Sequence, residues 1–209
     1  MSSQKQSGRK YELKRRAESQ ERTRQRIAAA AAELHEEVGP AETTVAEIAR
    51  RADVSRLTVY KHFPDNATLY PACSAHYATE HPLPDFAAAL APEDPVDRVR
   101  SLLRVVYGGV YREQQGMMRN LYRDRRRDPA LDEFMGNNAD AALMGLEDAL
   151  VAGFELEADR AARLRPLIGV ALDFWTWDRL NGEGMDDEAA AELMTEAIAS
   201  VAGAAATAR

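Results

Sequence analysis

The fold is decided by residues 44–63, TVAEIARRADVSRLTVYKHF. Thr44, followed three residues later by Glu47, predicts a capping box at the start of a helix. Asp53 stands where the chain must reverse, and aspartate tolerates a left-handed backbone better than most residues. Ser55 is a favourable N-cap for a second helix. The stretch therefore predicts two short helices joined by a tight turn.

The second predicted helix divides cleanly into an inner and an outer face. Val59 and Phe63 are four residues apart, so both can point inward. The remaining positions offer guanidinium, hydroxyl and methyl groups for base edges, and phenol, ammonium and imidazole groups for phosphates. These outer residues are Arg56, Leu57, Thr58, Tyr60, Lys61 and His62. The pattern favours a DNA-recognition helix, with an ordinary surface hairpin as the alternative for this stretch alone.

Residues 20–80 resemble the TetR family of bacterial transcriptional regulators. The resemblance rests on Thr43-Thr44-Val45, on Ile48-Ala49 with Val54-Ser55 across the turn, and on the run Thr58 to Phe63. It implies a three-helix head with a helix-turn-helix, joined to a helical bundle that binds an effector and dimerises. It also implies that the last two long helices pair with those of a second copy.

Three positions depart from the family pattern. Asp53 stands where glycine is usual, Leu57 where a small residue is frequent, and Asn66 where a lysine is common. An exposed leucine has no core role, so we predict that Leu57 meets a thymine methyl group, beside Arg56 and Thr58 as base contacts. We assign the DNA backbone contacts to Thr44, Tyr60, Lys61 and His62.

Charge is segregated along the chain, whose formal net charge is −7. Residues 1–62 hold 13 Lys/Arg and 9 Asp/Glu, a net of +4, and the remainder holds 14 against 25, a net of −11. This distribution predicts a basic DNA-facing part carried on an acidic body.

We expect three segments. Residues 1–18 are basic and polar, which predicts a disordered arm, with the first helix beginning near Ser19. Such an arm could add salt-dependent DNA affinity through Lys14, Arg15 and Arg16, or act only as a solubilising tail. Residues 19–64 form the predicted helix-turn-helix domain, and residues 65–209 the helical effector-binding and dimerisation domain.

The region after the motif reads as helices throughout. Asp65 is a predicted N-cap, Pro71 a predicted kink, and Asp94 with Pro95 a predicted helix start. Leu164 to Trp175 are placed on one long helix. Because no strand-like alternation occurs, the fold class is predicted to be all-α.

Aromatic and methionine side chains of this region could line a pocket for a small-molecule effector. Each of them singly is as well explained by the core. The candidate ligand contacts are Tyr107, Tyr111, Met118, Leu121, Tyr122, Met144, Phe174 and Trp177. The charge run at residues 123–128 is first explained as a solvated helix end, with an anionic effector or a second DNA contact as alternatives.

Other function classes find little support. The chain has no phosphate-binding glycine loop and no zinc-protease or serine-hydrolase motif, so we expect no enzyme. One cysteine, Cys73, excludes an internal disulfide and favours a reducing, cytoplasmic setting. No run is long enough to span a membrane. His76, Glu80 and His81 near Cys73 complete no metal signature, so no metal or other cofactor is expected.

We therefore predict a ligand-responsive transcriptional regulator, a repressor that binds a palindromic operator in double-stranded DNA as a homodimer and is released by a small-molecule effector. Its two recognition helices would enter major grooves about 34–36 Å apart. The alternatives are a DNA binder without an effector and a helical small-molecule-binding protein.

Overall fold

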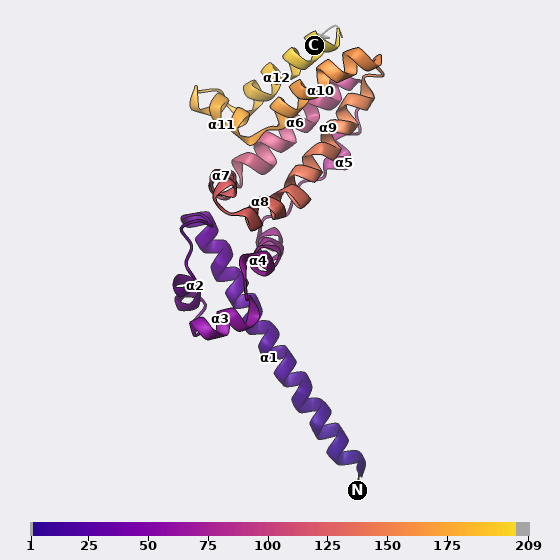
Figure 1. The fold of residues 1–209 in the computed structure, drawn as a ribbon. Coiled ribbons are helices and arrows are strands. Elements are labelled where there is room, and N and C mark those ends of the chain that lie inside the picture. The colour runs from indigo at the N-terminus through magenta and orange to yellow at the C-terminus, as the bar shows by residue number, and fades with distance from the viewer. Residues whose placement is uncertain (1, 204–209) are drawn as a thin grey trace. The chain divides into compact units, whose positions relative to one another are not determined.

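The computed structural model describes the backbone of residues 2–203 and the side chains of residue 12 and residues 14–203. Within these residues the structure is built from helices and contains no strand, which confirms the all-α fold class (Figure 1). Contacts divide the chain into two units. The head unit runs to His81 and also contains Asn120–Phe134, and the body unit comprises Pro82–Arg119 and the chain from Met135 onward.

This division differs from the expected boundary after residue 64. Helix α4 (Asn66–Glu80) packs along α1 (Ser2–Glu37), so it belongs to the head unit. Residues 120–134, which are distant in sequence, join the head unit as well. The physical reason is that their polar side chains bind the backbone at the end of α1.

Helix α1 begins at Ser2 rather than near Ser19, so the segment expected to be a disordered arm is helical. Its described part is rich in straight-chain residues with good helix propensity and has no proline. Pairs one turn apart support it, since Lys14 lies 3.9 Å from Glu18 and Gln25 donates to Glu21. The side chains of residues 1–11 and 13 lie outside the description.

The helix-turn-helix lies beside α1. Helices α2 (Val45–Arg51) and α3 (Arg56–His62) begin at the predicted caps Thr44 and Ser55, and the capping box of Thr44 and Glu47 is present. Ile48 and Val59 are 2% exposed, so the two short helices share one core with α1. Short helices of this size depend on such packing for their stability.

Helix α4 starts at the predicted N-cap Asp65 and continues through Pro71 to Glu80. Pro71 is exposed on its surface. The proline that was expected to kink the helix does not end it.

The body unit is a helical bundle (Figure 1). Helix α6 packs against α12, α9 packs against α10, and α10 packs against α12. Its elements are α5 (Phe86–Ala89), α6 (Pro95–Val106), a π-helical segment (Tyr107–Arg112), the start of α7 (Gln115–Asp124), a second π-helical segment (Gly136–Asp140), α9 (Ala141–Gly153), α10 (Ala158–Leu172), α11 (Phe174–Gly182) and α12 (Asp187–Ala202). A short 3₁₀ turn (Arg125–Arg127) and α8 (Pro129–Met135) follow α7.

The expected single helix from Leu164 to Trp175 is broken at Asp173. The backbone of Asp173 is extended, with φ −75° and ψ 134°, and its carboxylate accepts the N–H of Thr176 at 3.1 Å. Aspartate is a strong N-cap, and here it ends α10 and starts α11. The break leaves Phe174 fully buried and Trp175 42% exposed.

The cap of α6 gives a test of the body unit. Asp94 accepts the N–H groups of Val96 and Asp97 at 2.9 and 3.0 Å. We expect Asp94→Ala to lower the free energy of unfolding by about 1 kcal/mol, because two N–H groups lose their acceptor. Urea unfolding followed by circular dichroism measures this, with the exposed neighbour variant Glu93→Ala as control. Equal midpoints for the two variants would contradict the assignment.

Candidate nucleic-acid interface

Helix α3 presents one buried edge and one exposed face. Ser55 Oγ accepts the N–H of Thr58 at 3.1 Å and lies 2.8 Å from the Thr58 hydroxyl. Val59 and Phe63 are 2% and 3% exposed, and Leu57 is 79% exposed. Arg56, Leu57, Tyr60 and Lys61 are exposed, and Thr58 and His62 are half-buried. The outer face therefore has the residue types and exposure that groove contacts require.

The turn before α3 uses the predicted conformation. Asp53 has φ 51°, the left-handed region in which glycine is favoured. Val54 donates its N–H to Ala49 O at 2.9 Å, which closes the turn. At the start of α2, Thr44 Oγ1 accepts the N–H of Glu47 and donates to Glu47 Oε2 at 2.8 Å. The hydroxyl of Thr44 is thus occupied by its own cap.

Arg24 fixes the far end of α3. Its Nη1 donates to His62 O at 3.2 Å, and its guanidinium lies 4.3 Å from the centroid of the Phe63 ring. A cation at a helix C-terminus and over an aromatic face is stabilised by both contacts. Arg24 therefore holds the end of α3 against α1.

Helix α2 is tied to α1 by Arg51. Its two terminal nitrogens bind the two carboxylate oxygens of Glu37 at 2.6 and 2.7 Å, and Nη1 lies 3.4 Å from Glu33. The hydrogen bonds from Arg51 lower the pKa of Glu37. This bidentate geometry orients α2, although an exposed pair contributes little to stability.

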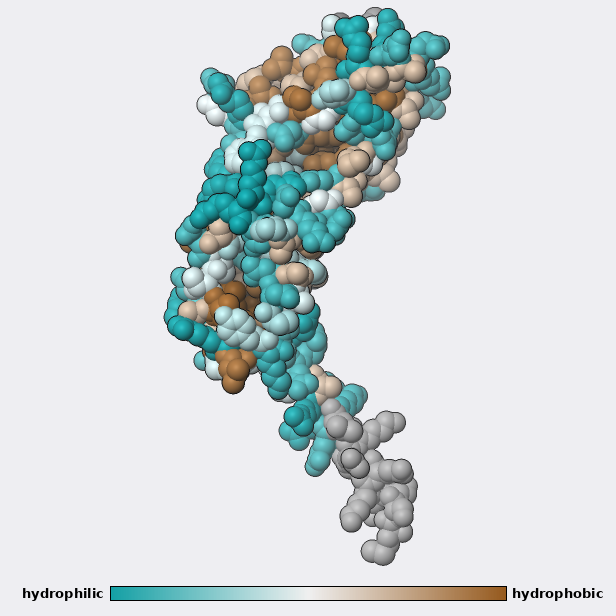
Figure 2. Space-filling view, viewed as in Figure 1, coloured by the Kyte–Doolittle hydropathy of each residue, from teal (hydrophilic) through white to brown (hydrophobic). Residues whose placement is uncertain are grey.

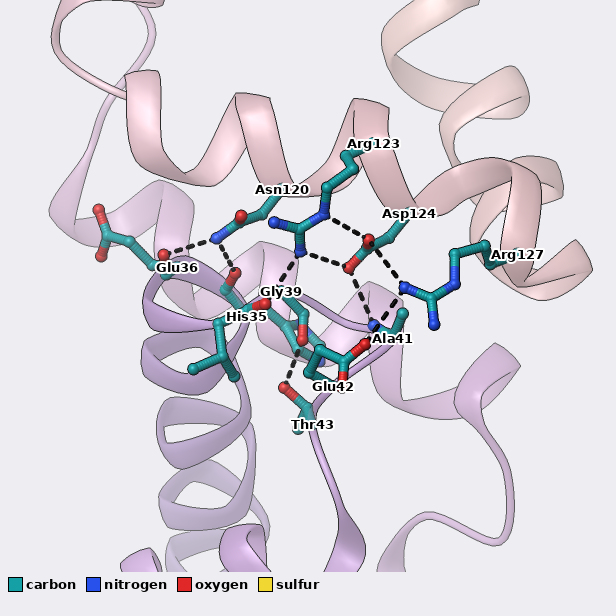
Figure 3. Close-up of polar contacts among 11 residues, drawn as sticks. His35, Glu36, Gly39, Ala41, Glu42, Thr43, Asn120, Arg123, Asp124 and Arg127 are labelled. Carbon is teal, nitrogen blue, oxygen red and sulfur yellow. Dashed lines mark hydrogen bonds and ion pairs between the residues drawn. The ribbon is translucent and has the colours of Figure 1, made fainter.

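Residues 120–128 bind the end of α1 (Figure 3). Asn120 Nδ2 donates to His35 O at 3.0 Å and to Glu36 O at 2.7 Å, and Arg123 Nη2 donates to Val38 O at 2.9 Å. The last carbonyls of a helix lack partners within the helix. Side chains from α7 therefore satisfy the C-terminus of α1.

Asp124 is 0% exposed and holds the loop between α1 and α2 (Figure 3). Its carboxylate accepts the N–H of Ala41 at 3.1 Å and is paired with Arg123 at 2.7 Å, with Arg127 at 3.9 Å. Burial alone would raise the pKa of Asp124, but these hydrogen bonds and positive charges hold it below the usual value. A Cβ on Gly39 would overlap the Arg123 guanidinium and the Asp124 carboxylate, and Gly39 also has φ 96°.

Asp128 makes a second anchor, to α4. It accepts the Tyr70 hydroxyl at 2.6 Å and Asn66 Nδ2 at 2.8 Å, and it caps the N–H of Ala130 at 2.9 Å. The amide of Asn66, at the position where the resembled family has a lysine, is engaged inside the head unit. Burial and the bond to Asp128 raise the pKa of Tyr70.

The burial of Asp124 was not predicted from the sequence. The run at residues 123–128 was read as a solvated helix end, and this holds for Arg126 and Arg127, which are exposed. It is wrong for Asp124, which is buried. The available signal was the alternation of Arg and Asp within six residues, a pattern in which a buried carboxylate can carry its own cations.

Residues 27–73 match the family model described as bacterial regulatory proteins, tetR family. The matched segment runs from within α1 to within α4 and includes both helices of the motif with their caps. Residues 27–73 are a TetR-family helix-turn-helix domain.

Solved structures show the same fold. A TetR-like transcriptional regulator from Rhodococcus sp. RHA1 is 20% identical, with a TM-score of 0.58 and coverage of 87% of this chain and 96% of that chain. NalD, the secondary repressor of the MexAB-OprM multidrug efflux pump in Pseudomonas aeruginosa, is 25% identical, with a TM-score of 0.53 and coverage of 87% and 95%. No curated protein matches the sequence.

Beyond the TetR-family domain, the predicted ligand contacts do not form one group. Tyr107, Tyr111, Phe174 and Trp177 pack together, with ring centroids of Tyr111 at 5.4 Å from Phe174 and 5.7 Å from Trp177. Their polar tips are satisfied: Tyr107 donates to Ala171 O at 2.6 Å, Tyr111 to Leu172 O, and Trp177 Nε1 to Asp187 at 2.8 Å. This arrangement favours a core role for these four.

The other four candidates lie elsewhere. Met118 is half-buried in the body unit, whereas Leu121 and Tyr122 are half-buried in the head unit. Met144, on α9, is 63% exposed.

The residues weighed as metal ligands are also dispersed. Cys73 is buried with its sulfur 3.7 Å from His35 Nδ1, His76 pairs with Glu80 at 3.9 Å, and His81 stacks on Tyr77. Among the described residues no three potential ligands gather at one point. The described helices include none with the length and apolar content that a membrane crossing needs.

The contacts of Asp124 with the loop between α1 and α2 can be tested by mutation. We expect Asp124→Ala to lower the free energy of unfolding of the head unit by about 1–3 kcal/mol, because the half-buried Ala41 N–H loses its acceptor. The folded-state pKa is lowered, so the contribution of Asp124 is present above about pH 4 and is lost as the pH falls through that lowered value.

Urea unfolding of wild type and Asp124→Ala at pH 7 and at pH 3 measures both effects. Asp132→Ala is the control, since that carboxylate is 57% exposed and pairs with Arg125 at 2.7 Å. The two variants losing equal stability at pH 7 would contradict a special role for Asp124.

Proposed function

We propose that this TetR-family chain is a ligand-responsive repressor that binds a palindromic operator as a homodimer. The exposed face of α3 carries the proposal: its core side chains are Val59 and Phe63, so the outer residues are free to meet DNA. Repression, rather than activation, is favoured by the likeness to NalD, a repressor at 25% identity.

Roles on DNA follow from side-chain chemistry. Arg56 can donate two hydrogen bonds to guanine, and Leu57 and Thr58 can meet thymine methyl groups or base edges. Tyr60, Lys61 and His62, toward the end of α3, suit phosphate oxygens. The hydroxyl of Thr44 is occupied by its own cap. Thr44 would nevertheless lie close to a phosphate, because it stands at the start of α2, where the helix dipole favours anions.

The helical form of α1 restricts the basic arm. Lys14, Arg15 and Arg16 are exposed on consecutive helical positions, which point about 100° apart. All three cannot face one DNA strand. We therefore expect at most two of them to neutralise phosphate in a complex that keeps α1 helical.

The DNA contacts are tested by fluorescence anisotropy with DNA from the region upstream of the gene that encodes this chain. We expect Arg56→Ala to weaken operator binding by about tenfold or more, because a bidentate base contact contributes about 1–3 kcal/mol. The variant should also lose its base preference at one position of the operator. Lys61→Ala should weaken all sequences alike and reduce the slope of affinity against salt by about one.

Leu57→Ala is the sharpest variant, because Leu57 is 79% exposed and its loss leaves no core cavity. It should reduce discrimination for thymine at one position while leaving the thermal midpoint unchanged. The exposed Leu83 in the body unit provides the matched control, Leu83→Ala. If Leu57→Ala leaves operator preference unchanged, the assignment of Leu57 to a thymine methyl group is wrong. If the wild type binds no palindrome in a salt-dependent manner, the proposed function is wrong.

Homodimerisation is proposed through the C-terminal helices. Apolar side chains on α10, α11 and α12 remain 41–50% exposed, a pattern typical of subunit interfaces. They are Val170, Trp175, Leu193 and Val201. The exposed indole of Trp175 is the strongest candidate, since tryptophan is enriched at energetic centres of interfaces.

Trp175→Glu should convert the dimer to monomer, because a buried unpaired carboxylate is costly in an apolar interface. Sedimentation equilibrium measures the mass at several concentrations. Leu83→Glu, which also replaces an exposed apolar residue by a charge, should stay dimeric. A dimer that persists in Trp175→Glu would place the interface elsewhere.

The polar groups of Tyr107, Tyr111 and Trp177 already donate hydrogen bonds within the body unit. This favours a second candidate function, a TetR-family DNA binder that binds no effector among these residues. The two are separated by screening compounds against the preformed DNA complex. Release of DNA by a compound that binds the body unit supports the ligand-responsive repressor. If compounds leave DNA affinity unchanged, the second candidate is preferred.

A further inference from the structure

The head unit contains a cavity of about 250 Å³ among α1, α2, α3 and α4. Figure 2 shows a hydrophobic recess in the region where α1, α2 and α3 meet. Its walls are mainly apolar and include Pro40, Val45, Ile48, Val59, Phe63 and Leu69. An apolar cavity of about 150 Å³ is sufficient for benzene, so this one can hold a single or fused aromatic ring.

One buried polar side chain, His35, lines the cavity and is only 4% exposed. Its Nδ1 lies 3.7 Å from the sulfur of Cys73, whose thiol donates to Tyr70 O at 3.3 Å. With the thiol proton directed to Tyr70 O, the sulfur can accept Nδ1–H, and we assign the ring proton to Nδ1 on that ground. Nε2 is then a hydrogen-bond acceptor.

No hydrogen bond to His35 Nε2 is formed among the described residues, so this acceptor is available to a ligand. Burial lowers the pKa of His35 to about 4, against the opposing attraction of Asp124 and Asp128. The imidazole is thus neutral at pH 7.

The charges around the cavity disfavour an anion. Asp65 is the charged side chain among the described lining residues, and no lysine or arginine lines the walls. Tyr70, which also lines the cavity, already donates its hydroxyl to Asp128. A carboxylate ligand would find no cation, whereas a neutral donor finds Nε2.

We propose that this cavity binds a neutral one-ring or two-ring aromatic molecule whose single O–H or N–H group donates to His35 Nε2, with phenol and indole as representatives. Tyr60 of α3 lines the same cavity. A ligand there contacts a residue assigned to the DNA backbone, so its binding weakens DNA binding. That consequence rests on the proposed function, but binding itself does not.

Binding is tested with the full chain in the absence of DNA, by calorimetric titration of phenol and indole. Saturable binding at one site per chain is expected. Val45→Phe, which fills the cavity from its wall, should lower the affinity at least tenfold. Val105→Phe, which makes the same change at a half-buried position of α6 in the body unit, should bind as the wild type does.

The hydrogen bond is tested with His35→Phe, which retains an aromatic ring and removes the acceptor. Phenol affinity should fall about tenfold, the loss expected for one hydrogen bond, while toluene affinity is unchanged. Circular dichroism verifies that each variant is folded. If His35→Phe does not fold, the ratio of phenol to toluene affinity in the wild type replaces it, and a ratio near one removes the hydrogen bond from the proposal.

Absence of saturable phenol and indole binding, or equal affinities for wild type and Val45→Phe, would overturn the proposal. A chain that binds phenol but no operator would retain this site and lose the proposed function. If the chain binds operator but no aromatic probe, the proposed function stands and the cavity proposal fails. The two failures are therefore distinguishable.

Discussion

A buried carboxylate, that of Asp124, is the constraint on which the head unit depends. A charge removed from water must be matched by hydrogen bonds and opposite charge, and Asp124 obtains both from the Ala41 N–H and from Arg123. Because Arg123 also donates to Val38 O, the same pair fixes the end of α1 and the loop that follows it. Gly39 has to be glycine there, since any Cβ would collide with that pair. The start of α2, a few residues further along, is placed by this contact.

Helix α3 is likewise held by side chains that bind its backbone. Ser55 satisfies the first turn of α3, and Arg24 satisfies its last turn from α1. Between these ends, Val59 supplies the buried contact. Stability is thus provided by the ends and one edge of the helix. Leu57, on the outer face of α3, is 79% exposed and contributes nothing to the core.

Helix α7 belongs to both units. Its first turns carry Gln115 and Arg119, which bind Asp178 of the body unit, and its last turns carry Asn120 and Asp124, which bind the head unit. Each set of contacts therefore lies within one unit, and the division falls inside α7, between Arg119 and Asn120.

Sequence alone determined the local features: the capping box at Thr44, the caps at Ser55 and Asp94, the left-handed Asp53, and the helical class. These depend on hydrogen bonds within three or four residues, which a sequence pattern records directly. The tertiary structure decided what depends on distant partners. It buried Asp124 against a loop more than 80 residues earlier, turned Arg24 into a support for α3, and placed four predicted ligand aromatics in a packed cluster. It also decided the break at Asp173, because a strong N-cap can start a helix or lie within a longer one, and only packing selects between them.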